Sequence, residues 1–516
     1  MQALHSPAQA AQWLRQHVKG VLCTDSRAVN SGDGFIAWPG AAVDGRAFVI
    51  SALDKGATAC LVEAQGSEQW SADWLTAFDK VPAKLATYSG LKADTGWIAN
   101  AYYEQPSRSL KILAVTGTNG KTSTAWWLAQ ALNALSKAEQ SSRCAVVGTL
   151  GVGEPPNLVT TGMTTPDPVL LQAQFRKFAT AGVTHCAIEA SSIGIAEKRL
   201  DGTHIHLAIF TNLTQDHLDY HGSMDAYWQA KEALFAWPDL QVAVVNIDDQ
   251  HGAKLAAVLQ KNKTLDVWTC SSQNKLARLQ ALNLERTLNG MAFDVKESDQ
   301  VMRIQTSLMG DYNVDNLLGV MASMRSLNIP LHTVIDVCSR LQAVPGRMEK
   351  VVGVEGIALP LTVVDYAHTP DAVAQTLAAL KPVTQAMGSQ LWCVLGCGGD
   401  RDASKRPLMA AAAELGADHV VLTSDNPRSE SPSAIVQDML KGLKNPASTY
   451  QELDRAKAIA YAVANAGSRD VILIAGKGHE DTQEVAGVKH PFDDRVHAHE
   501  ALVQRANTTT PMGVQA

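Results

Sequence analysis

One short stretch limits the fold of this chain more than any other, because it joins a strand, a glycine loop and a helix. An apolar run over residues 112–115 leads into the loop, and a helical pattern follows from residue 123. The loop reads Thr116-Gly117-Thr118-Asn119-Gly120-Lys121-Thr122. Backbone N–H groups at such a helix start bind phosphate, the lysine adds a charge, and the last threonine hydroxyl can bind Mg²⁺. Val115 stands where the first glycine of the usual loop would be, so a chance glycine turn is the alternative to the nucleoside triphosphate site that we predict.

Length and composition favour an ordinary globular protein. The 516 residues suggest about three domains. A net charge of −7 and the lack of a sustained basic run argue against nucleic acid or anionic membranes as partners. No window reaches the roughly 18 apolar residues of a membrane span, and the first residues do not resemble a secretion signal. The eight cysteines are scattered, without C-x-x-C spacing, so we expect a cytoplasmic protein. We also expect the protein to be a monomer.

The chain divides into three zones, which we expect to be domains over residues 1–107, 108–343 and 344–516. In the second and third zones, continuous apolar runs of four or five residues alternate with helical stretches. This alternation predicts an α/β protein with parallel or mixed sheets that helices cover on both faces. In such sheets ligands bind beyond the carboxyl ends of the strands, so the residues just after each strand are the ones that carry chemistry.

Two strand ends in the second zone carry acidic and imidazole groups. Glu189 follows one strand, and the stretch Thr211 to His221, which contains Asp216, His217 and Asp219, follows the next. With a phosphate loop nearby, these groups can form a Mg²⁺ shell. The spacing of the two histidines alone is also compatible with zinc, or with simple loop polarity.

Two further polar residues of this zone have a structural and a functional interpretation. Lys231 lies in a helical stretch, where a lysine is usually a solvated surface group. Asn316 lies among the polar residues that open a later helix, so it either caps that helix or contacts adenine.

Four strand ends of the third zone are polar, and they predict one shared crevice. Arg401 and Arg428 can each bind a carboxylate through two hydrogen bonds, and Glu480 can hold an ammonium group. A crevice with both signs of charge suits a zwitterionic, amino-acid-like substrate.

Taken together and in order, from Asp25-Ser26-Arg27 to Gly476-Lys477-Gly478-His479-Glu480, these motifs resemble the Mur ligases over nearly the whole length. The resemblance implies three domains: one for a UDP group, a central P-loop ATPase-like domain, and a Rossmann-like C-terminal domain for the incoming amino acid. It is strongest to the member that adds meso-diaminopimelate to a UDP-linked muramoyl dipeptide in peptidoglycan synthesis.

The resemblance also implies roles for individual residues. Lys121, His217 and a carbamylated Lys231 would be catalytic, and Thr122, Glu189, His217 and Lys231 would hold Mg²⁺. ATP would bind to the loop Thr116 to Thr122 and to Asn316, Arg347 and Asp365. The UDP-linked substrate and the amino acid would contact Ser26, Ala41, Ala42, Val43, Thr164, Thr165, Ser191, Glu197, Arg199, Arg401, Asp425, Asn426, Pro427, Arg428, Gly476 and Glu480.

Two positions depart from the family pattern. Ile193 stands where the family commonly has histidine, and Glu197 where it commonly has glutamine. A carboxylate near an anionic substrate is unfavourable unless it is paired.

The implied reaction is an ATP-dependent amide ligation through an acyl phosphate. The rivals among enzymes are the L-lysine-adding relative and folylpolyglutamate synthetase, and the extended first zone argues against the latter. A nucleotide-switched binding module is the rival from another class, and it would not need the mixed-charge crevice.

Overall fold

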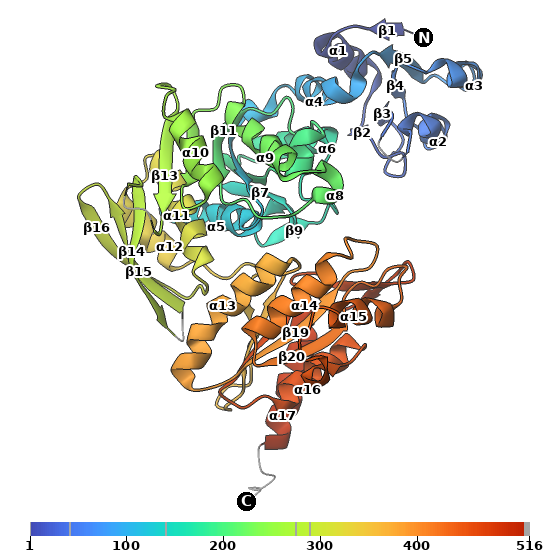
Figure 1. Cartoon of the computed structure of the whole chain (residues 1–516). Helices are drawn as coiled ribbons and strands as arrows, with labels where there is room; N and C mark the ends of the chain where they lie inside the picture. Colours follow the sequence, from blue (N-terminus) through green and yellow to red (C-terminus); the bar gives the residue numbers. More distant parts are fainter. Residues whose placement is uncertain (1, 41–42, 140–141, 274–275, 288–289, 510–516) are drawn as a thin grey trace, which may run out of the picture.

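The computed structural model describes residues 2–40, 43–139, 142–273, 276–287 and 290–509. Its described strands form three main sheets that follow one another along the chain, together with a short hairpin. We call the parts built on the main sheets the first, central and third units; Figure 1 shows them in sequence from the N-terminus to the C-terminus. Ala41 and Ala42, which the sequence suggests as substrate contacts, lie outside the described residues.

The first unit has a five-stranded parallel sheet in the order β1-β5-β4-β3-β2. Helices α1 and α4 pack on one face, whereas the apolar residues of α2 and α3 belong to the cluster on the other. Its elements are β1 (Gln2–Leu4), α1 (Pro7–His17), β2 (Leu22–Cys23), β3 (Gly34–Ala37), η1 (Gly45–Phe48), α2 (Val49–Asp54), β4 (Ala59–Glu63), α3 (Glu68–Phe78), β5 (Lys84–Tyr88) and α4 (Leu91–Tyr102).

The central unit has an eleven-stranded mixed sheet in the order β16-β15-β14-β13-β12-β11-β6-β10-β7-β8-β9. Its elements are η2 (Pro106–Ser109), β6 (Lys111–Thr116), α5 (Lys121–Glu139), β7 (Cys144–Gly148), β8 (Gly151–Glu154), β9 (Asn157–Val159), α6 (Pro168–Thr180), β10 (His185–Glu189), α7 (Ser192–Ala196), β11 (Ile205–Phe210), α8 (Leu218–His221), α9 (Met224–Glu232), η3 (Ala233–Ala236), β12 (Val242–Asn246), α10 (Gln250–Leu259), β13 (Asp266–Ser271), β14 (Leu279–Thr287), β15 (Gly290–Glu297), β16 (Gln300–Thr306), α11 (Tyr312–Ser326) and α12 (Leu331–Ser339).

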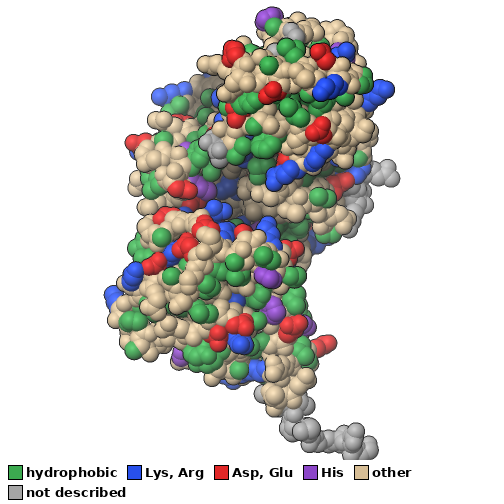
Figure 2. Space-filling model, turned by 90° about the vertical axis from the view of Figure 1, so that its right-hand side faces the viewer, with side chains coloured by type: hydrophobic (Ala, Val, Ile, Leu, Met, Phe, Trp, Pro, Cys, Tyr) green, Lys and Arg blue, Asp and Glu red, His purple; other side chains and the backbone are tan. Residues whose placement is uncertain are grey.

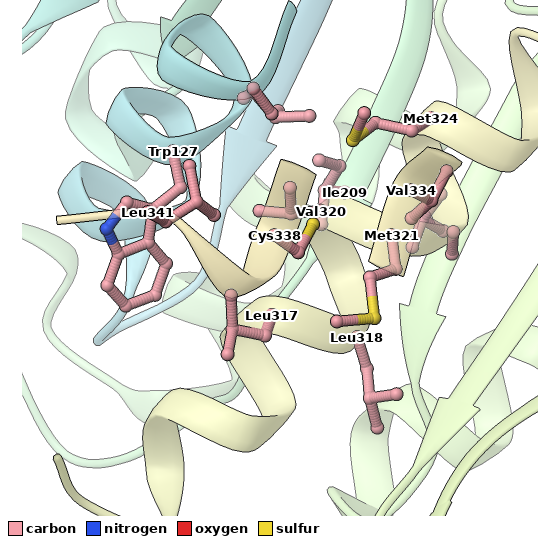
Figure 3. Packing of buried hydrophobic residues seen from close by; sticks show 14 of the residues in the cluster. Trp127, Ile209, Leu317, Leu318, Val320, Met321, Met324, Val334, Cys338 and Leu341 are labelled. Carbon is pink, nitrogen blue, oxygen red and sulfur yellow. The ribbon is translucent and has the colours of Figure 1, made fainter. Parts of the chain in front are cut away.

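The strands from β14 to β7 are parallel, and antiparallel strands close both edges. Helices α5, α11 and α12 bury one face of this sheet. Figure 3 shows this packing, with Trp127 of α5, Ile209 of β11 and Met321 of α11 among the buried side chains. Helices α6, α9 and α10 cover the other face. The expected alternation of buried strands and covering helices is confirmed.

The third unit has a six-stranded sheet in the order β17-β18-β22-β19-β20-β21, parallel except for β17. Helices α13 to α15 pack on one face and α16 and α17 on the other. Its elements are β17 (Glu349–Lys350), β18 (Leu361–Asp365), α13 (Pro370–Met387), β19 (Leu391–Cys397), α14 (Lys405–Gly416), β20 (His419–Ser424), α15 (Pro432–Leu440), η4 (Pro446–Ser448), β21 (Tyr450–Gln451), α16 (Arg455–Asn465), β22 (Val471–Ala475), the hairpin β23 (Thr482–Val485) and β24 (Val488–Pro491), and α17 (Asp494–Thr509).

The first and central units meet in close contact between α4 and the chain that follows α7. A Cβ atom at Gly96 would lie 2.2 Å from the carbonyl oxygen of Asp201, and one at Gly202 would lie 2.5 Å from the carbonyl oxygen of Gly96. Val169 of α6 belongs to the same buried cluster as the apolar residues of the first unit. This junction is therefore packed like a protein core. Among the described residues, no helix combines the length and apolar character that a bilayer crossing requires.

A buried ion pair fastens the last helix to the third sheet. The Arg455 guanidinium donates to both carboxylate oxygens of Asp494 at 2.7 Å, and both side chains are fully buried. The same guanidinium donates to the carbonyl oxygens of Ser424 and Ala475, at the ends of β20 and β22. Loss of the carboxylate would leave a buried charge without compensation.

We therefore expect Asp494→Asn to destabilise the third unit by about 3–5 kcal/mol. Asp454→Asn, at the exposed Lys457–Asp454 pair, is the matched control and should change stability by less than about 1 kcal/mol. Limited proteolysis across a urea series, with cleavage sites identified by mass spectrometry, reports the third unit separately. Equal urea midpoints for the two variants would contradict a structural role for the buried pair.

Candidate active site

The glycine loop lies at the carboxyl end of β6, between β10 and β11 of the central sheet. Gly117 has φ +147°, and a Cβ atom there would lie 1.9 Å from the Thr211 hydroxyl oxygen. Gly120 has φ +83°, and its Cβ would lie 2.2 Å from Oδ1 of Asn316. Side chains of L-residues fit neither conformation nor space, so both positions require glycine.

The segment after β11 holds this loop in place. The backbone N–H of Thr118 donates to the Asn212 carbonyl at 2.8 Å, and that of Asn119 donates to Asn212 Oδ1 at 2.9 Å. The Thr211 hydroxyl donates to the Asn119 carbonyl at 2.6 Å. The loop is thus fixed before any ligand arrives, which lowers the entropic cost of binding an anion.

Two cationic side chains face the loop. Lys121 Nζ donates to the Gly117 and Thr118 carbonyls at 2.9 and 2.8 Å. Burial lowers the pKa of Lys121, and Glu189 and Asp216 oppose that effect. Arg347 approaches Thr122 Oγ1 at 3.4 Å, and its buried Nε has no hydrogen-bond acceptor among the described residues. A buried N–H donor without an acceptor is costly, so this geometry favours an anionic ligand beside Thr122.

Glu189 and Thr122 form the oxygen-rich part of the site. The Thr122 hydroxyl donates to Glu189 Oε2 at 3.0 Å, and the backbone N–H of Thr149 donates to Glu189 Oε1 at 2.8 Å. Among the residues with described positions, no three His, Cys, Asp or Glu side chains gather into a metal-binding cluster. The hydroxyl and the carboxylate are hard oxygen donors, so they fit Mg²⁺ when substrate phosphates supply further ligands.

Lys231 is not a surface group. Helix α9 carries it into the interior, where it is 1% exposed, and its Nζ donates to the Gly117 carbonyl at 2.7 Å. The Nζ also lies 4.2 Å from the ring centre of Tyr227. Burial, helped by the neighbouring Lys121, lowers the pKa of Lys231 well below its ordinary value. A lysine in this setting has an enhanced neutral, nucleophilic form.

His217 lies beside Asp216 in a strained backbone conformation. Its φ is +52°, in the left-handed region, and its Nε2 lies 3.5 Å from Asp216 Oδ2. Lys405, at the start of α14 in the third unit, binds Asp216 Oδ1 at 2.8 Å. Burial would raise the pKa of Asp216, but His217 and Lys405 together bring it down to about 2. His221 is engaged separately, since its Nε2 lies 3.0 Å from the Ser192 hydroxyl.

Asn316 does not cap its helix, because α11 begins earlier and Asp311 stands at the cap position. Its Nδ2 donates to Asn313 Oδ1 at 3.1 Å. Asp365 ends β18 in the third unit and accepts the backbone N–H of Met348 at 2.7 Å. Burial raises the pKa of Asp365, while the nearby Arg347 opposes the rise.

A cavity of about 990 Å³ joins these groups. Residues of the central and third units line it, and Figure 2 shows the molecule hollowed between its upper and lower parts, with Lys and Arg side chains at the rim. From the predicted nucleotide, metal and catalytic sets, the lining contains Thr118, Asn119, Gly120, Lys121, Thr122, Glu189, His217, Lys231, Asn316, Arg347 and Asp365. Thr116 and Gly117 precede them in the same loop.

The residues predicted to hold the sugar-peptide lie next to this cavity. Thr164 and Ser191 line it, and the Thr165 hydroxyl lies 2.9 Å from that of Ser191. Arg199 donates to the Thr165 carbonyl at 2.9 Å. Glu197 is paired by the protein itself: Lys92 of α4 lies 2.7 Å from one oxygen, and the Tyr220 hydroxyl donates to the other. The hydrogen bonds from Lys92 and Tyr220 lower the pKa of Glu197.

The predicted contacts in the first unit lie apart from this cavity. Ser26 is buried and Val43 is exposed, and neither belongs to the cavity lining.

The residues predicted to form a crevice in the third unit gather around Asn426, and they line neither of the two cavities described in this structure. Asn426 Nδ2 donates to Glu480 Oε2 at 2.7 Å, and the fully buried Lys477 binds the same oxygen at 3.0 Å. Gly476 has φ +118°, and a Cβ there would lie 2.5 Å from Asp425 Oδ2. The carboxylate, the amide and the glycine are thus brought together as predicted from their strand ends.

The two arginines of this crevice differ. Arg428 is mostly buried, with φ +52°, and it donates to the Gly399 carbonyl at 2.7 Å and lies 3.8 Å from Glu484. Arg401 is exposed, and its NH1 donates to the Asp400 carbonyl at 3.4 Å. Pro427 is buried between Asn426 and Arg428. The protein therefore satisfies part of the charge of Arg428 without any ligand.

Several site residues lie outside the sequence prediction. Asn212 fixes the loop, Tyr227 covers Lys231, and Thr149 binds Glu189. Asp371, at the start of α13, accepts a hydrogen bond from Asn119 Nδ2 at 3.2 Å and so joins the third unit to the loop. The position of Asn212 just after a strand could have identified it as a site residue, because ligands bind beyond the carboxyl ends of such strands. The roles of Tyr227 and Asp371 depend on tertiary contacts that no local pattern reveals.

Comparison with known proteins places this geometry in one family. The profile described as Mur ligase middle domain matches residues 115–324, the Mur ligase glutamate ligase domain matches 346–478, and the Mur ligase family catalytic domain matches 18–102. A protein from Acidovorax sp. (strain JS42), named UDP-N-acetylmuramoyl-L-alanyl-D-glutamate–2,6-diaminopimelate ligase, is 57% identical over 98% of this chain and 99% of its own. A similarly named protein from Janthinobacterium sp. (strain Marseille) is 44% identical over 96% and 97%.

Solved structures agree with this assignment. A structure of a UDP-N-acetylmuramoyl-L-alanyl-D-glutamate–2,6-diaminopimelate ligase has a TM-score of 0.63 and 37% identity, over 93% of this chain and 94% of that one. A folylpolyglutamate synthase from Mycobacterium tuberculosis shares the fold at a TM-score of 0.57, with 19% identity over 73% of this chain and 91% of that one. The family profiles, the near full-length relatives and the arrangement of the loop all agree: this chain belongs to the Mur ligase family.

Proposed function

We propose that this protein is an ATP-dependent, ADP-forming ligase that joins meso-diaminopimelate to UDP-N-acetylmuramoyl-L-alanyl-D-glutamate during peptidoglycan precursor synthesis. The observation that carries the proposal is the prearranged phosphate loop with the unsatisfied Arg347 beside it, in a chain 57% identical to a relative of that name. The L-lysine-adding relative is the alternative. The eight free cysteines, seven of them buried, are compatible with a cytoplasmic enzyme.

The three units suggest a division of labour. We assign the UDP group to residues 1–107, ATP to 108–343 and the amino acid to 344–516. Ser26, with Ala41 to Val43, would contact the UDP part, and Thr164, Thr165, Ser191 and Arg199 would place the peptide near the loop. Glu197 is held by Lys92, so its charge is compensated next to an anionic substrate. We propose a monomer.

The first chemical step is transfer of the γ-phosphoryl group. The D-Glu γ-carboxylate forms a bond to phosphorus as the bond to ADP breaks, giving an acyl phosphate. Lys121 and Arg347 lie where they can stabilise charge on the transferred group. Thr122, Glu189, His217 and the carbamate of Lys231 would hold Mg²⁺, which would neutralise phosphate charge when bound.

In the second step, the amine of diaminopimelate forms a bond to the acyl carbon. The bond from that carbon to the phosphate oxygen breaks, and phosphate leaves. The attacking nitrogen loses a proton in the process. The crevice of Asp425, Asn426, Arg428 and Glu480 would orient the amino acid toward the cavity. Correct placement of the two reactants supplies much of the acceleration in such a reaction.

We expect Lys121→Ala to lower ligation at least about a hundredfold, because the site loses its fixed positive charge but no core volume. Lys80→Ala, an exposed lysine of the first unit, is the matched control and should stay active. Phosphate release that depends on both the UDP-linked dipeptide and diaminopimelate is the measurement. Normal turnover by folded Lys121→Ala protein would remove the proposed role of this lysine.

The second prediction concerns carbamylation of Lys231. The neutral amine of Lys231 forms a nitrogen–carbon bond to CO₂ and releases a proton, which yields a carboxylate. Lys231→Ala should be nearly inactive, and a short carboxylic acid in the buffer should restore part of the activity. Lys254→Ala, exposed on α10, is the control that should need no rescue.

A carbamate can also be observed without an activity assay. Wild-type protein equilibrated with ¹³C-labelled CO₂ should give one protected carbamate NMR signal that Lys231→Ala lacks. Full activity of Lys231→Ala without an additive, or the same signal in both proteins, would show that this lysine is only structural.

The third prediction concerns the choice of amino acid. Diaminopimelate differs from lysine by one distal carboxylate, which Arg428 is placed to bind. Because Gly399 and Glu484 already satisfy part of the guanidinium, loss of Arg428 should narrow the preference by about tenfold to a hundredfold, the value of one charged hydrogen-bonded contact. The ratio of diaminopimelate to lysine incorporated is measured with both amino acids present, for wild-type protein and for Arg428→Ala. Arg469→Ala, which changes an exposed arginine, is the control. An unchanged ratio would assign selectivity elsewhere.

A further inference from the structure

A second, smaller pocket lies at the opposite end of the central sheet from the phosphate loop. It has a volume of about 430 Å³ and is built where strands β6, β10 and β11 begin. We call it the basic pocket; its main lining residues are Arg108, Lys111, His185, His204, His206 and Gln241. Strand β6 separates Lys111 from Thr116 by five residue steps, or about 16 Å. The basic pocket is therefore distinct from the cavity of the proposed reaction.

The backbone of the basic pocket is fixed by hydrogen bonds between its segments. The N–H of Lys111 donates to the Thr184 carbonyl at 2.9 Å, and that of Gln241 donates to the His206 carbonyl at 3.1 Å. The N–H of His204 donates to the Ser107 hydroxyl at 3.0 Å. The pocket thus exists without a ligand, as most small-molecule sites do. Three of its lining residues, Arg108 to Leu110, belong to the segment that leads from α4 into β6 of the central unit.

Two exposed cationic side chains, those of Arg108 and Lys111, lie here together with three histidines. Lys111 lies close enough to lower the pKa of both His185 and His206, in each case after the larger effect of burial. The remaining charged groups that shift these two histidines are histidines as well. The carboxylate of Asp239 lies 3.9 Å from His204 Nδ1 and is largely exposed. Within the described chain, the side chains of Arg108 and Lys111 have no acceptor.

The arrangement is unusual in a protein with a net charge of −7. Arg108 and Lys111 are exposed at the entry to β6, so water and salt screen their charges and both side chains can turn toward an anion. Arginine, lysine, imidazole and the Gln241 amide all offer N–H donors, which is the set that recognises phosphate oxygens. The volume exceeds that of a single phosphate ion and falls within the usual range for small-molecule sites.

We propose that the basic pocket binds the phosphate group of a small phosphorylated metabolite. Arg108 and Lys111 supply fixed charge from the entry to β6, His206 supplies a donor from β11, and Gln241 supplies a neutral donor at the edge. A bound phosphate would join the start of β6 to β11 and to the segment that leads in from the first unit. This site is independent of the ligation reaction.

The proposal predicts how a bound anion changes the titration of His206. Burial and Lys111 lower the pKa of His206, and His204 adds to that effect. A bound phosphate places negative charge beside the ring, so it should raise the pKa of His206.

Calorimetric titration of the full-length protein tests the site. The phosphate loop is first filled with Mg²⁺ and a non-hydrolysable ATP analogue, so that only other anion sites remain. Glucose 6-phosphate, inorganic phosphate and glucose are then titrated at pH 6 and pH 8. We expect one saturable site per chain for the two phosphates and none for glucose. Tighter binding of glucose 6-phosphate would identify an ester as the ligand, and equal binding would identify the free ion.

Variants separate this pocket from the rest of the surface. Lys111→Met and His206→Gln should each weaken phosphate binding at least about tenfold, while Lys80→Met, an exposed lysine of the first unit, should leave it unchanged. His206→Gln keeps a polar side chain of similar size, and NMR titration of the histidine rings in wild-type protein gives a measurement that needs no variant. Absence of saturable binding below about 10 mM at pH 6, or equal affinity in all three variants, would overturn the proposal.

Discussion

The fit of the glycine loop between β10 and β11 is the constraint on which the rest of the site depends. Gly117 packs against Thr211 and Gly120 against Asn316, so the loop touches a strand end on one side and helix α11 on the other. Any Cβ atom at either position would push these partners away. Lys121 and Thr122 follow Gly120 directly in the chain. The packing of the two glycines therefore also fixes where these side chains lie relative to Glu189 and Lys231. The loop therefore sets the geometry of the cations, the oxygen donors and the cavity together.

Sequence patterns predicted the parts of this site that depend on local order. Buried strands followed by polar residues indicated that the loop and Glu189 lie at one edge of the central sheet, because the carboxyl ends of parallel strands meet at one edge. The role of the residues around Asn426 stays a prediction. The patterns could not show that Lys231 is buried, since the same helical spacing serves a surface lysine. They also could not show that Glu197 pairs with Lys92, because these two residues are far apart in the sequence and belong to different units. Long-range packing decides both, and no local periodicity records it.

Burial is the largest influence on the pKa values of the two lysines of the site, Lys121 and Lys231. Three cationic side chains, those of Lys121, Lys231 and Arg347, lie near one loop. Glu189 and Asp216 are the carboxylates that raise the pKa of Lys121. Burial lowers the pKa of both lysines; Glu189 and Asp216 oppose that effect at Lys121, and Asp216 opposes it at Lys231. The buried Nε of Arg347 has no hydrogen-bond partner among the described residues, so an anion placed there gains a contact that the protein does not supply. The basic side chains beside the loop can therefore pair with a polyanion when it binds, because the carboxylates of the site do not occupy all of their N–H donors.

The two junctions between units differ in the forces that hold them. At the first, backbones touch through Gly96 and Gly202, and a residue of α6 joins the apolar cluster of the first unit. At the second, the contacts beside the phosphate loop are polar: Asn119 with Asp371, and Lys405 with Asp216. Salt screens such partly exposed charges but does little to apolar packing. The Lys92–Glu197 pair between the first two units is open to the same screening. Higher salt should therefore weaken charged contacts at both junctions, while the apolar packing between the first two units keeps them together.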